Sequence, residues 1–553
     1  MTENELFINK GLQFENAVSL YSPVRKTAEL FPKHTALRFM GKNISYASLD
    51  KKVTKLAVNL LKLGLEKGEA VTFALPNIPE SVYLLYAAAH SGLKCSPLHP
   101  LSTPEAVCSA MKKSGSRIAF VLSDNAQKIA EKCDFAKIIA VNPANSLILG
   151  KRLYSIKNPQ PREGGNLHRF SSFEKQPESI VLPQKSISCP ACENTDVLLQ
   201  SGGTTGTPKV IGLSANSINN LAKKGLWILG IEKGTDSGML SVLPVFHGFG
   251  LAMGVHAMLC HGGKNVLFPK FRRASAIKEI KRGNVQFVIG VPRLYEALLS
   301  HPDFNGKMLR SLSVAFVGGD FVPRTLLESF DRHIKKNGGT CRLFEGYGLT
   351  ETVTVCSVNT YKDNRGETVG KPLLGLEIEA FDFSAEPPAP LPRGEKGELS
   401  VSGDTLMEEY VADADATEKV FFTHGGKKFV KTGDCGYVDS DGFVHFVSRY
   451  KRIIKVKGIP VYPMEIEQLV CAMPEIRGAC AVPLSNNGGE QKIILFAESD
   501  NPALGEQIRS NIREKISVYA EPHDIVFVKE FPRTDVSKID TKILLANYSN
   551  KKI

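Results

Sequence analysis

The 553-residue sequence has no stretch of about 18 apolar residues, and therefore predicts no membrane-spanning helix. The segment from Met1 to Leu20 lacks a basic start followed by an apolar run, which argues against a secretory signal. The eleven cysteines are scattered along the chain, a usage that favours free thiols in a reducing compartment. These absences predict a cytoplasmic protein and leave peripheral contact with a membrane open.

Metal-binding and nucleic-acid-binding patterns are also missing. Cys189 and Cys192 form a CxxC pair without the two further ligands that a zinc site needs, so we interpret them as loop thiols. The chain carries 69 basic and 57 acidic residues, a formal charge of +12, but no run of five like charges. Because basic and aromatic residues are not interleaved, we expect phosphate-rich small molecules rather than nucleic acid as partners.

The composition is that of an ordinary globular protein, with 42% apolar and 23% charged residues. Strand-like runs such as Val71–Leu75 and Ile118–Leu122 alternate with helix-like segments such as Asp50–Gly68 and Glu80–Gly92. This alternation predicts an α/β fold in which helices cover parallel sheets. The segment 142–194, rich in Pro, Ser, Gly and Lys, predicts a long surface excursion.

A second, smaller unit is predicted at the C-terminal end. The basic segment SRYKRIIKVKG begins at Ser448, and beyond it we expect a helix from Pro463, strands near Ala479 and Ile493, and a helix near Ala503. That pattern is typical of a small α+β domain. The expected organisation is an N-terminal domain at 1–448, a hinge at 449–452 and a mobile C-terminal domain at 453–553.

The segment Ser201–Lys209, SGGTTGTPK, follows the predicted strand Val197–Gln200 and precedes the apolar run Val210–Leu213. Glycines allow backbone N–H groups to approach phosphate, and hydroxyl groups add further donors. The segment differs from a Walker A loop, in which Gly-Lys-Ser/Thr opens a helix. It predicts a phosphate-binding loop, and the alternative is a flexible surface turn.

From this loop onward the sequence resembles the adenylate-forming superfamily of acyl-CoA synthetases, peptide-synthetase adenylation domains and luciferases. Further motifs follow in the family's order: LPVFHGFG at 243–250, EGYGLTE at 345–351, KTGD at 431–434, SRYKRIIKVKGIPVYPMEIE at 448–467 and PRTDVSKI at 532–539. Each motif alone could arise by chance. Together, in this order, they make the resemblance cover essentially the whole chain.

The resemblance implies an ATP-dependent acid–thiol ligase. A carboxylic acid and ATP would give an acyl-adenylate and pyrophosphate, and the acyl group would then pass to coenzyme A, with Mg²⁺ as cofactor. Two alternatives stay open: a fatty acyl-AMP ligase that loads a carrier protein, and a non-catalytic nucleotide-binding relative. The sequence predicts no oligomeric state.

The resemblance also implies which residues bind ATP and AMP. Thr350 would contact the α-phosphate, Tyr347 would stack on adenine, and Glu351 would supply a hard oxygen ligand to Mg²⁺. Asp434 would accept hydrogen bonds from the ribose hydroxyls, and Arg449 would present its fork of donors to the nucleotide. The full nucleotide set is Ser201, Gly202, Gly203, Thr204, Thr205, Gly206, Thr207, Lys209, Gly319, Glu345, Gly346, Tyr347, Thr350, Asp434, Arg449 and Lys538.

Four residues are expected to act in catalysis: Lys538, Thr350, Glu351 and His247. Lys538 would lie between the substrate carboxylate and the α-phosphate, because their reaction brings two anions together. His247 would lie at the mouth of the acyl pocket, although a lone histidine in an apolar stretch is more often a core residue. Lys451 is the expected hinge about which the C-terminal domain turns between the two half-reactions.

The expected acyl pocket consists of His247, Phe249, Met253, Gly318 and Gly346. Phe249 and Met253 would form an apolar wall without a hydroxyl for a phenol, which favours a medium- or long-chain aliphatic acid over an aromatic one. Lys270, Lys457 and Gly458 follow the pattern of coenzyme A contacts. They favour coenzyme A over a carrier protein as the acyl acceptor.

Overall fold

The computed structural model describes residues 19–146, 161–175, 195–201, 209–231, 233–384, 386–457, 459–485, 491–533 and 539–550. Several residues singled out from the sequence lie outside these ranges: Gly202, Gly203, Thr204, Thr205, Gly206, Thr207, Gly458, Lys538, Cys189 and Cys192.

The first large sheet has nine strands among the described residues, in the order β16-β15-β14-β13-β12-β10-β11-β1-β2. Neighbouring strands from β1 through β11, β10, β12 and β13 to β14 are parallel, and β2, β15 and β16 are antiparallel to their neighbours. The bounds are β1 Thr35–Phe39, β2 Lys42–Ser45, β10 Gly238–Ser241, β11 Lys264–Leu267, β12 Phe287–Gly290, β13 Val314–Val317, β14 Leu343–Gly348, β15 Val355–Val358 and β16 Lys371–Pro372.

The second large sheet has eight described strands, in the order β20-β9-β8-β4-β3-β5-β6-β7. Strand β9 is antiparallel to both β8 and β20, and the other neighbours are parallel. The bounds are β3 Ala70–Ala74, β4 Lys94–Pro97, β5 Ile118–Leu122, β6 Lys137–Val141, β7 Leu167–Arg169, β8 Val197–Gln200, β9 Val210–Leu213 and β20 Glu409–Tyr410.

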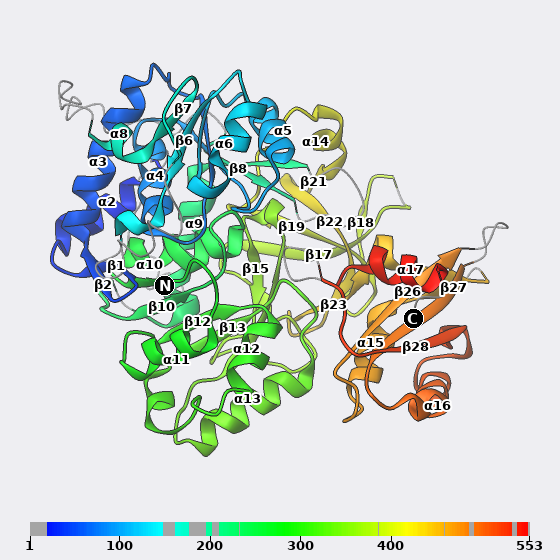
Figure 1. The fold of residues 1–553 in the computed structure, drawn as a ribbon. Helices are drawn as coiled ribbons and strands as arrows, with labels where there is room; N and C mark the ends of the chain where they lie inside the picture. The colour runs from blue at the N-terminus through cyan, green and yellow to red at the C-terminus, as the bar shows by residue number, and fades with distance from the viewer. Residues whose placement is uncertain are drawn as a thin grey trace.

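Helices cover both faces of these sheets (Figure 1). Phe287 and Ile289 of β12 belong to one apolar cluster, and the intervening Val288 belongs to another, because successive strand residues point to opposite faces. The first cluster joins both sheets to α2 Ser22–Leu30, α3 Tyr46–Lys62, α4 Pro79–His90, α9 Ala215–Leu229 and α10 Ala257–His261. The outer face of the second sheet carries α5 Pro104–Ser114 and α6 Ser123–Lys132. The outer face of the first sheet carries α11 Arg273–Lys281, α12 Pro292–Leu299 and α13 Arg324–Lys336.

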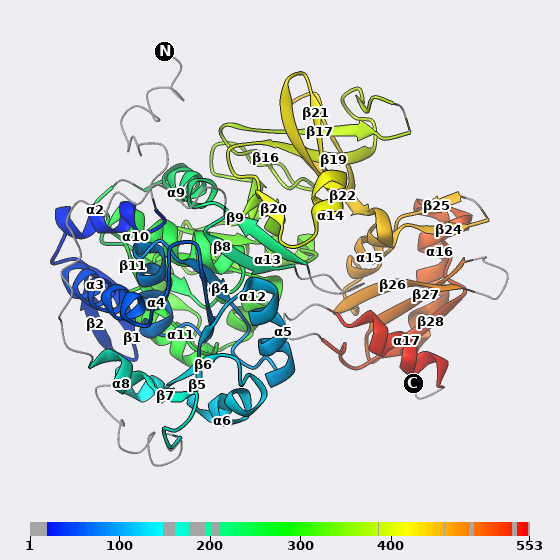
Figure 2. The same ribbon diagram turned by 90° about the horizontal axis from the view of Figure 1, so that it is seen from above.

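A third sheet is antiparallel and lies beside the two large sheets (Figure 2). It runs β18-β17-β19-β22-β21, with β23 paired to β22. The bounds are β17 Leu376–Asp382, β18 Ala389–Pro390, β19 Gly397–Gly403, β21 Phe421–His424, β22 Lys427–Val438 and β23 Val444–Arg449, with α14 Ala414–Val420 beside them. The expectation of parallel sheets is wrong for this part of the chain, because hairpin connections replace crossover helices.

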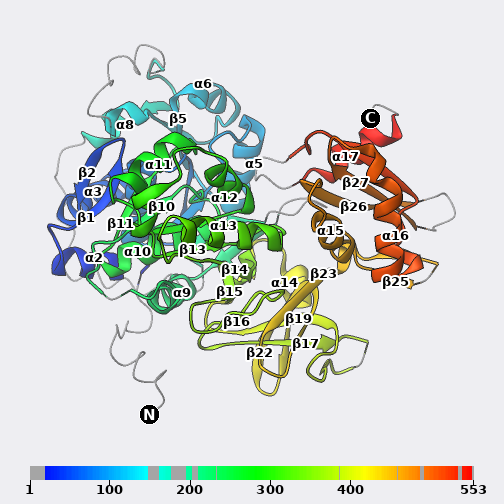
Figure 3. The ribbon, with the colours of Figure 1, turned by 90° about the horizontal axis from the view of Figure 1, so that it is seen from below.

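The C-terminal residues form a separate small lobe (Figures 1 and 3). Its three-stranded sheet, β26-β27-β28, buries one apolar cluster on each face. The bounds are β24 Ile454–Val456, β25 Ile459–Val461, α15 Pro463–Cys471, β26 Gly478–Ser485, β27 Gln491–Glu498, α16 Gly505–Lys515, β28 Asp524–Val528 and α17 Thr541–Ser549. The predicted fold class, a large part of helix-covered sheets and a small α+β domain, is confirmed.

Two other expectations need correction. The segment 142–194 is not wholly a surface excursion, because β7 extends the second sheet beside β6, and α8 Phe170–Glu174 buries two phenylalanines. The cysteines are not all free thiols: Cys108 and Cys133 form a disulfide where α5 meets the end of α6, at a Cα–Cα distance of 5.6 Å. Among the described residues, no helix combines the length and apolarity needed to cross a bilayer.

Candidate active site

The base of the predicted phosphate-binding loop is a short antiparallel hairpin of β8 and β9. The Ser201 N–H donates to the Lys209 carbonyl oxygen at 2.8 Å, and the Lys209 N–H donates to the Ser201 hydroxyl at 3.0 Å. The Asp196 carboxylate, just before β8, accepts from the Ala215 N–H at the start of α9 at 2.7 Å. The structure therefore fixes both ends of the loop against the second sheet.

A first polar group, here called the Asp434 cluster, consists of Tyr347, Asp434 and Arg449. The Tyr347 hydroxyl donates to Asp434 Oδ2 at 2.7 Å, and Arg449 Nε lies 3.3 Å from Asp434 Oδ1. Asp434 is only 1% exposed, and it faces Arg449 directly across the β22–β23 pair. Three of the predicted nucleotide residues thus come together, at the ends of β14 and β23 and within β22.

A second polar group, here called the Glu351 cluster, consists of Lys209, Glu351 and Tyr410. The Tyr410 hydroxyl donates to Glu351 Oε1 at 2.9 Å, and Lys209 Nζ lies 3.9 Å from the centre of the Tyr410 ring. The Glu351 carbonyl oxygen also accepts from the Met407 N–H at 2.8 Å. Sequence reasoning found Lys209 and Glu351 but missed Tyr410, whose segment carries no phosphate-binding or catalytic pattern.

Close backbone approaches pack the motif segments tightly together. A Cβ on Gly248 would lie 1.8 Å from the Val353 carbonyl oxygen, so the histidine motif abuts the segment that follows Glu351. A Cβ on Gly318 would lie 2.7 Å from the Gly346 carbonyl oxygen. Only glycine permits these approaches. Gly318 and Gly346, both predicted to line the acyl pocket, are therefore in direct backbone contact.

The predicted acyl-pocket residues on the histidine motif occupy different environments. His247 and Phe249 are half-buried, and the ring of His247 lies 4.5 Å from that of Phe246. Phe249 begins a π-helix, Phe249–His256, a form that often occurs at functional sites. Met253 on that helix is 2% exposed and lies toward Gly225 of α9, within the central apolar cluster.

Burial changes the acid–base behaviour of the two side chains on β14. It raises the pKa of Glu345 to about 8, so this carboxyl group is largely neutral near pH 7. Burial, with the neighbouring Asp434 charge second, raises the pKa of the Tyr347 hydroxyl well above its usual value. Tyr347 therefore stays a hydrogen-bond donor to Asp434.

The residues proposed to bind coenzyme A are not gathered in this arrangement. Lys457 directly follows β24 at the turn of the β24–β25 hairpin, which lies at the outer end of the small domain (Figures 2 and 3). Lys270 is exposed after β11 on the large part. Bringing Lys457 to the polar clusters would require the small domain to turn, as the predicted hinge at Lys451 implies.

Among the described residues, three ion pairs join the large part and the expected hinge to the small domain, and we call them the domain face. Arg452 pairs with the buried Glu467 on α15. Lys396 lies 3.1 Å from Glu465, and Arg293 on α12 lies 3.1 Å from Glu530.

Arg533 forms an isolated antiparallel bridge with Ile539, so the described residues on both sides of 534–538 are adjacent.

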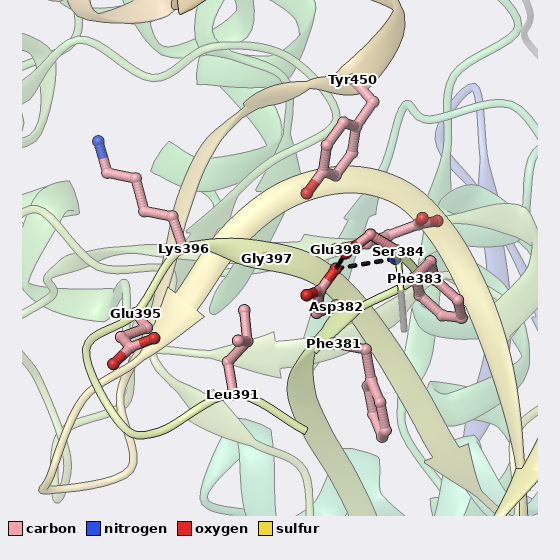
Figure 4. Close-up of a pocket in the computed structure, with 10 residues that line it drawn as sticks. All are labelled: Phe381, Asp382, Phe383, Ser384, Leu391, Glu395, Lys396, Gly397, Glu398 and Tyr450. Atoms are coloured by element: carbon pink, nitrogen blue, oxygen red, sulfur yellow. Dashed lines mark hydrogen bonds between the residues drawn. The ribbon is translucent and has the colours of Figure 1, made fainter. Parts of the chain in front are cut away.

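Two cavities lined by described residues lie outside the polar clusters. One, of about 580 Å³, is lined by Phe383, Lys396, Glu398 and Tyr450 beside the expected hinge (Figure 4). Its Glu398 accepts from the Gly433 N–H at 3.0 Å and so supports the turn before Asp434. The other, of about 500 Å³, separates α12 and α13 from the small domain. Both border the domain face, and we place the candidate active site at the polar clusters instead.

The side chains of the polar clusters could bind Mg²⁺ only if the substrate supplied most of the ligands of the ion. Among the described residues no group of three or more His, Cys, Asp or Glu side chains could hold a metal ion. Mg²⁺ commonly binds through one or two carboxylates, with phosphate oxygens and waters completing its shell. The single carboxylate of Glu351 fits that mode.

Comparison with known proteins defines the class. The model of the AMP-binding enzyme family matches residues 24–411, and that of the AMP-binding enzyme C-terminal domain matches residues 465–538. The chain therefore belongs to the AMP-binding enzyme family, and the superfamily resemblance found from the motifs is confirmed.

Individual relatives agree with this assignment. A long-chain-fatty-acid–CoA ligase of Bacillus subtilis is 29% identical, over 95% of this chain and 94% of the relative. A 4-coumarate–CoA ligase of Humulus lupulus is 27% identical, over 92% and 89%. ATP-bound MatB from Rhodopseudomonas palustris has the same fold, with a TM-score of 0.79 and 21% identity over 95% of this chain and 99% of MatB.

Proposed function

We propose that this protein is an ATP-dependent acid–thiol ligase that makes an acyl-CoA. A carboxylate oxygen attacks the α-phosphorus of ATP, the bond to pyrophosphate breaks, and an acyl-adenylate forms. The thiol of coenzyme A then attacks the acyl carbonyl, and AMP leaves. The observation that carries the proposal is that β14 and the turn directly after it supply one member of each polar cluster, Tyr347 to the Asp434 cluster and Glu351 to the Glu351 cluster.

The two clusters suit different parts of the nucleotide. Asp434 offers buried carboxylate oxygens to the ribose hydroxyls, and Tyr347 and Arg449 hold it in place. Glu351 and Lys209 bring one negative and one positive charge to the base of the loop at 201–209. We propose that Thr350 and the loop bind phosphate and that Glu351 holds Mg²⁺, which would neutralise phosphate charge when bound.

Lys538 is proposed to carry the positive charge that joins the two reacting anions. The small domain would deliver it, and would then turn about Lys451 so that Lys457 and Gly458 meet coenzyme A together with Lys270. The exposed pairs of the domain face support such a turn, because separating them costs little.

For the acid we propose a medium- or long-chain fatty acid. The half-buried Phe249 and the buried Met253 supply apolar surface on the π-helix that follows His247, and we propose that Gly318 and Gly346 complete the acyl pocket. Long-chain-fatty-acid–CoA ligases of Bacillus subtilis and Salmonella typhimurium, 29% and 28% identical, support this choice. Relatives named for 4-coumarate and ferulate make aromatic acids the comparison to test.

The test is pyrophosphate release from ATP and Mg²⁺ with a panel of fatty and aromatic acids, with and without coenzyme A. We expect acid-dependent release that is largest with fatty acids, and an acyl-CoA product when coenzyme A is present. Adenylate without thioester would identify a carrier-loading ligase, and no release with any acid would favour a non-catalytic relative. Glu506→Ala, which changes an exposed carboxylate on α16 of the small domain, serves as a surface control.

A further inference from the structure

Tyr410 is the one member of the Glu351 cluster with no role in the proposed function so far. It is 6% exposed, yet its hydroxyl and its ring face both contact charged groups of the candidate site. The hydroxyl donates to Glu351 Oε1 at 2.9 Å, and the ring centre lies 3.9 Å from Lys209 Nζ. One side chain thus contacts an anion and a cation that come from separate motifs.

The backbone around Tyr410 is fixed from two sides. Strand β20 pairs with β9, Tyr410 opposite Ile211, and the Val411 N–H donates to the Val210 carbonyl oxygen at 2.8 Å. Because Val210 follows Lys209, this pairing sets the ring beside the lysine side chain. On the other side, the Tyr410 N–H donates to the Thr417 hydroxyl at 2.9 Å.

The register of β20 on β9 depends on a close approach at Gly212. A Cβ there would lie 2.8 Å from the Thr195 hydroxyl and 3.2 Å from the Glu409 side chain. Glycine lets the short strand lie flat against β9, with Thr195 donating to Glu409 at 3.3 Å. Strand pairing and this close approach therefore set the position of the Tyr410 ring.

The tyrosine also keeps two opposite charges separate. Lys209 and Glu351 do not form an ion pair with each other, because no pair between them is found within an N···O distance of 4.0 Å among the described residues. A phenol suits this position, because its hydroxyl can donate to a carboxylate while its ring face attracts an ammonium group. Without it, the two side chains would be free to neutralise each other and to turn away from a bound phosphate.

We propose that Tyr410 is a positioning residue for the adenylation half-reaction, holding Glu351 toward Mg²⁺ and Lys209 toward phosphate. This inference rests on the proposed function, in which those two side chains serve ATP. The ring and the hydroxyl have separable tasks: the hydroxyl orients the carboxylate, and the ring face holds the ammonium group.

The experiment measures ATP affinity by calorimetry, with and without Mg²⁺ and without any acid. Tyr410→Phe keeps the ring, so its affinity for ATP alone should match wild type. The tightening by Mg²⁺ should weaken by about tenfold, because outer partners of metal ligands typically change metal affinity by about 10- to 100-fold. Tyr410→Leu should also lose affinity for ATP alone, by several-fold.

Tyr21→Phe is the matched control, since it removes a tyrosine–carboxylate bond of 2.7 Å to Asp50 in the same part of the molecule. It should leave both affinities unchanged. A Tyr410→Phe protein with the wild-type Mg²⁺ response would overturn the proposal. So would equal losses of affinity with and without Mg²⁺ together with a lower melting temperature, which a merely structural role predicts.

A double-mutant cycle with Glu351→Gln adds a second check. If Tyr410 acts through Glu351, Tyr410→Phe should weaken the Mg²⁺ response no further in the Glu351→Gln background, and independent losses would contradict the proposal. These binding measurements need no turnover. If wild type binds ATP with Mg²⁺ but releases no pyrophosphate with any acid, the proposed function fails. The binding data for the Tyr410 variants would still show whether Tyr410 positions Glu351 and Lys209.

Discussion

The polar clusters and the domain face are held together by different chemistry. Within the Asp434 cluster, a carboxylate that is 1% exposed accepts a hydrogen bond from the Tyr347 hydroxyl, and both residues lie on paired strands. On the domain face, the side chains of Lys396 and Glu465 are 41% and 34% exposed, and those of Arg293 and Glu530 are 51% and 69% exposed. Exposed pairs contribute only about 0–1 kcal/mol. The difference indicates that the Asp434 cluster stays in place, whereas the two exposed pairs of the domain face can separate at little cost.

The largest expected effect tests that separation. Lys538→Ala removes the charge that the small domain is proposed to deliver, so adenylation should slow by about 30- to 1,000-fold, equivalent to about 2–4 kcal/mol. Thioester formation from supplied acyl-adenylate should stay close to wild type. Separate assays of the half-reactions measure both rates, with the exposed Lys542→Ala as control. Equal losses in both half-reactions of a folded variant would rule out this division of labour.

Next in size is the loss of the buried carboxylate. Asp434→Ala leaves Tyr347 and Arg449 without their common partner and removes the proposed ribose contact. ATP affinity should fall by about 100-fold, since each hydrogen bond to a charged group contributes about 1.5–3 kcal/mol. Calorimetry with ATP measures this, and Asp404→Ala, whose exposed carboxylate pairs with Lys224, is the control. Unchanged ATP affinity would remove Asp434 from the site.

The buried member of the domain face should behave differently from the exposed ones. Arg452→Ala leaves Glu467, 4% exposed, with the Ala481 N–H as its remaining partner. We expect the unfolding free energy of the small domain to fall by about 2 kcal/mol, because an unpaired buried charge is costly. Hydrogen exchange in α15 and β26 reports this. Adding Glu467→Leu should restore part of the loss, and a further loss would contradict the interpretation.

The exposed pair Lys396–Glu465 gives a smaller effect. Lys396→Ala should lower the unfolding free energy by less than about 1 kcal/mol, and the loss should shrink further at high salt. Thermal melts at low and high salt measure it. Lys427→Ala, which breaks a similarly exposed pair with Glu377 inside the large part, is the control. A loss of several kcal/mol would mean that the domain face is not easily separated.

The last prediction concerns the pH dependence of stability and the β14 side of the site. The pKa of Glu345 rises from 4.5 to about 8 on folding, so the neutral form is favoured in the folded protein. Its contribution to stability is fully present below pH 4.5 and is lost as the pH rises through about 8. Glu345→Gln stays neutral, so its melting temperature should gain on wild type across that window. A constant difference would contradict this, and the exposed Glu328→Gln gives the baseline.

The sequence predicted those parts of the fold that depend on local pattern. The strands Ile118–Leu122, Val197–Gln200 and Val210–Leu213 and the start of the helix at Pro463 match the structure, because apolar runs and a helix-starting proline are local signals. The third, antiparallel sheet was missed, since β17 and β22 carry several charged residues and β18 and β21 are short. The disulfide between Cys108 and Cys133 was not predicted either, because it depends on the packing of α5 against α6.

The candidate site shows the same division. Glu351, Tyr347 and Asp434 stand in motifs that a reader of the sequence can find, and the structure places Tyr347 against Asp434. Tyr410 stands in MEEYVADADAT, where nothing local signals a role. Its position follows from the pairing of β20 with β9, a contact between distant parts of the chain. Such tertiary placement, more than residue type, decides which tyrosine meets the site.

The contact between Gly248 and Val353 has a practical consequence for protein engineering. Variant libraries that aim to change the preferred acid can vary Phe249 and Met253, which are proposed to line the acyl pocket and lie on the same π-helical segment. They should leave Gly248 unchanged, because any other residue would put a carbon 1.8 Å from a carbonyl oxygen of the adjoining segment. Screening effort spent at that position would return misfolded protein instead of new selectivity.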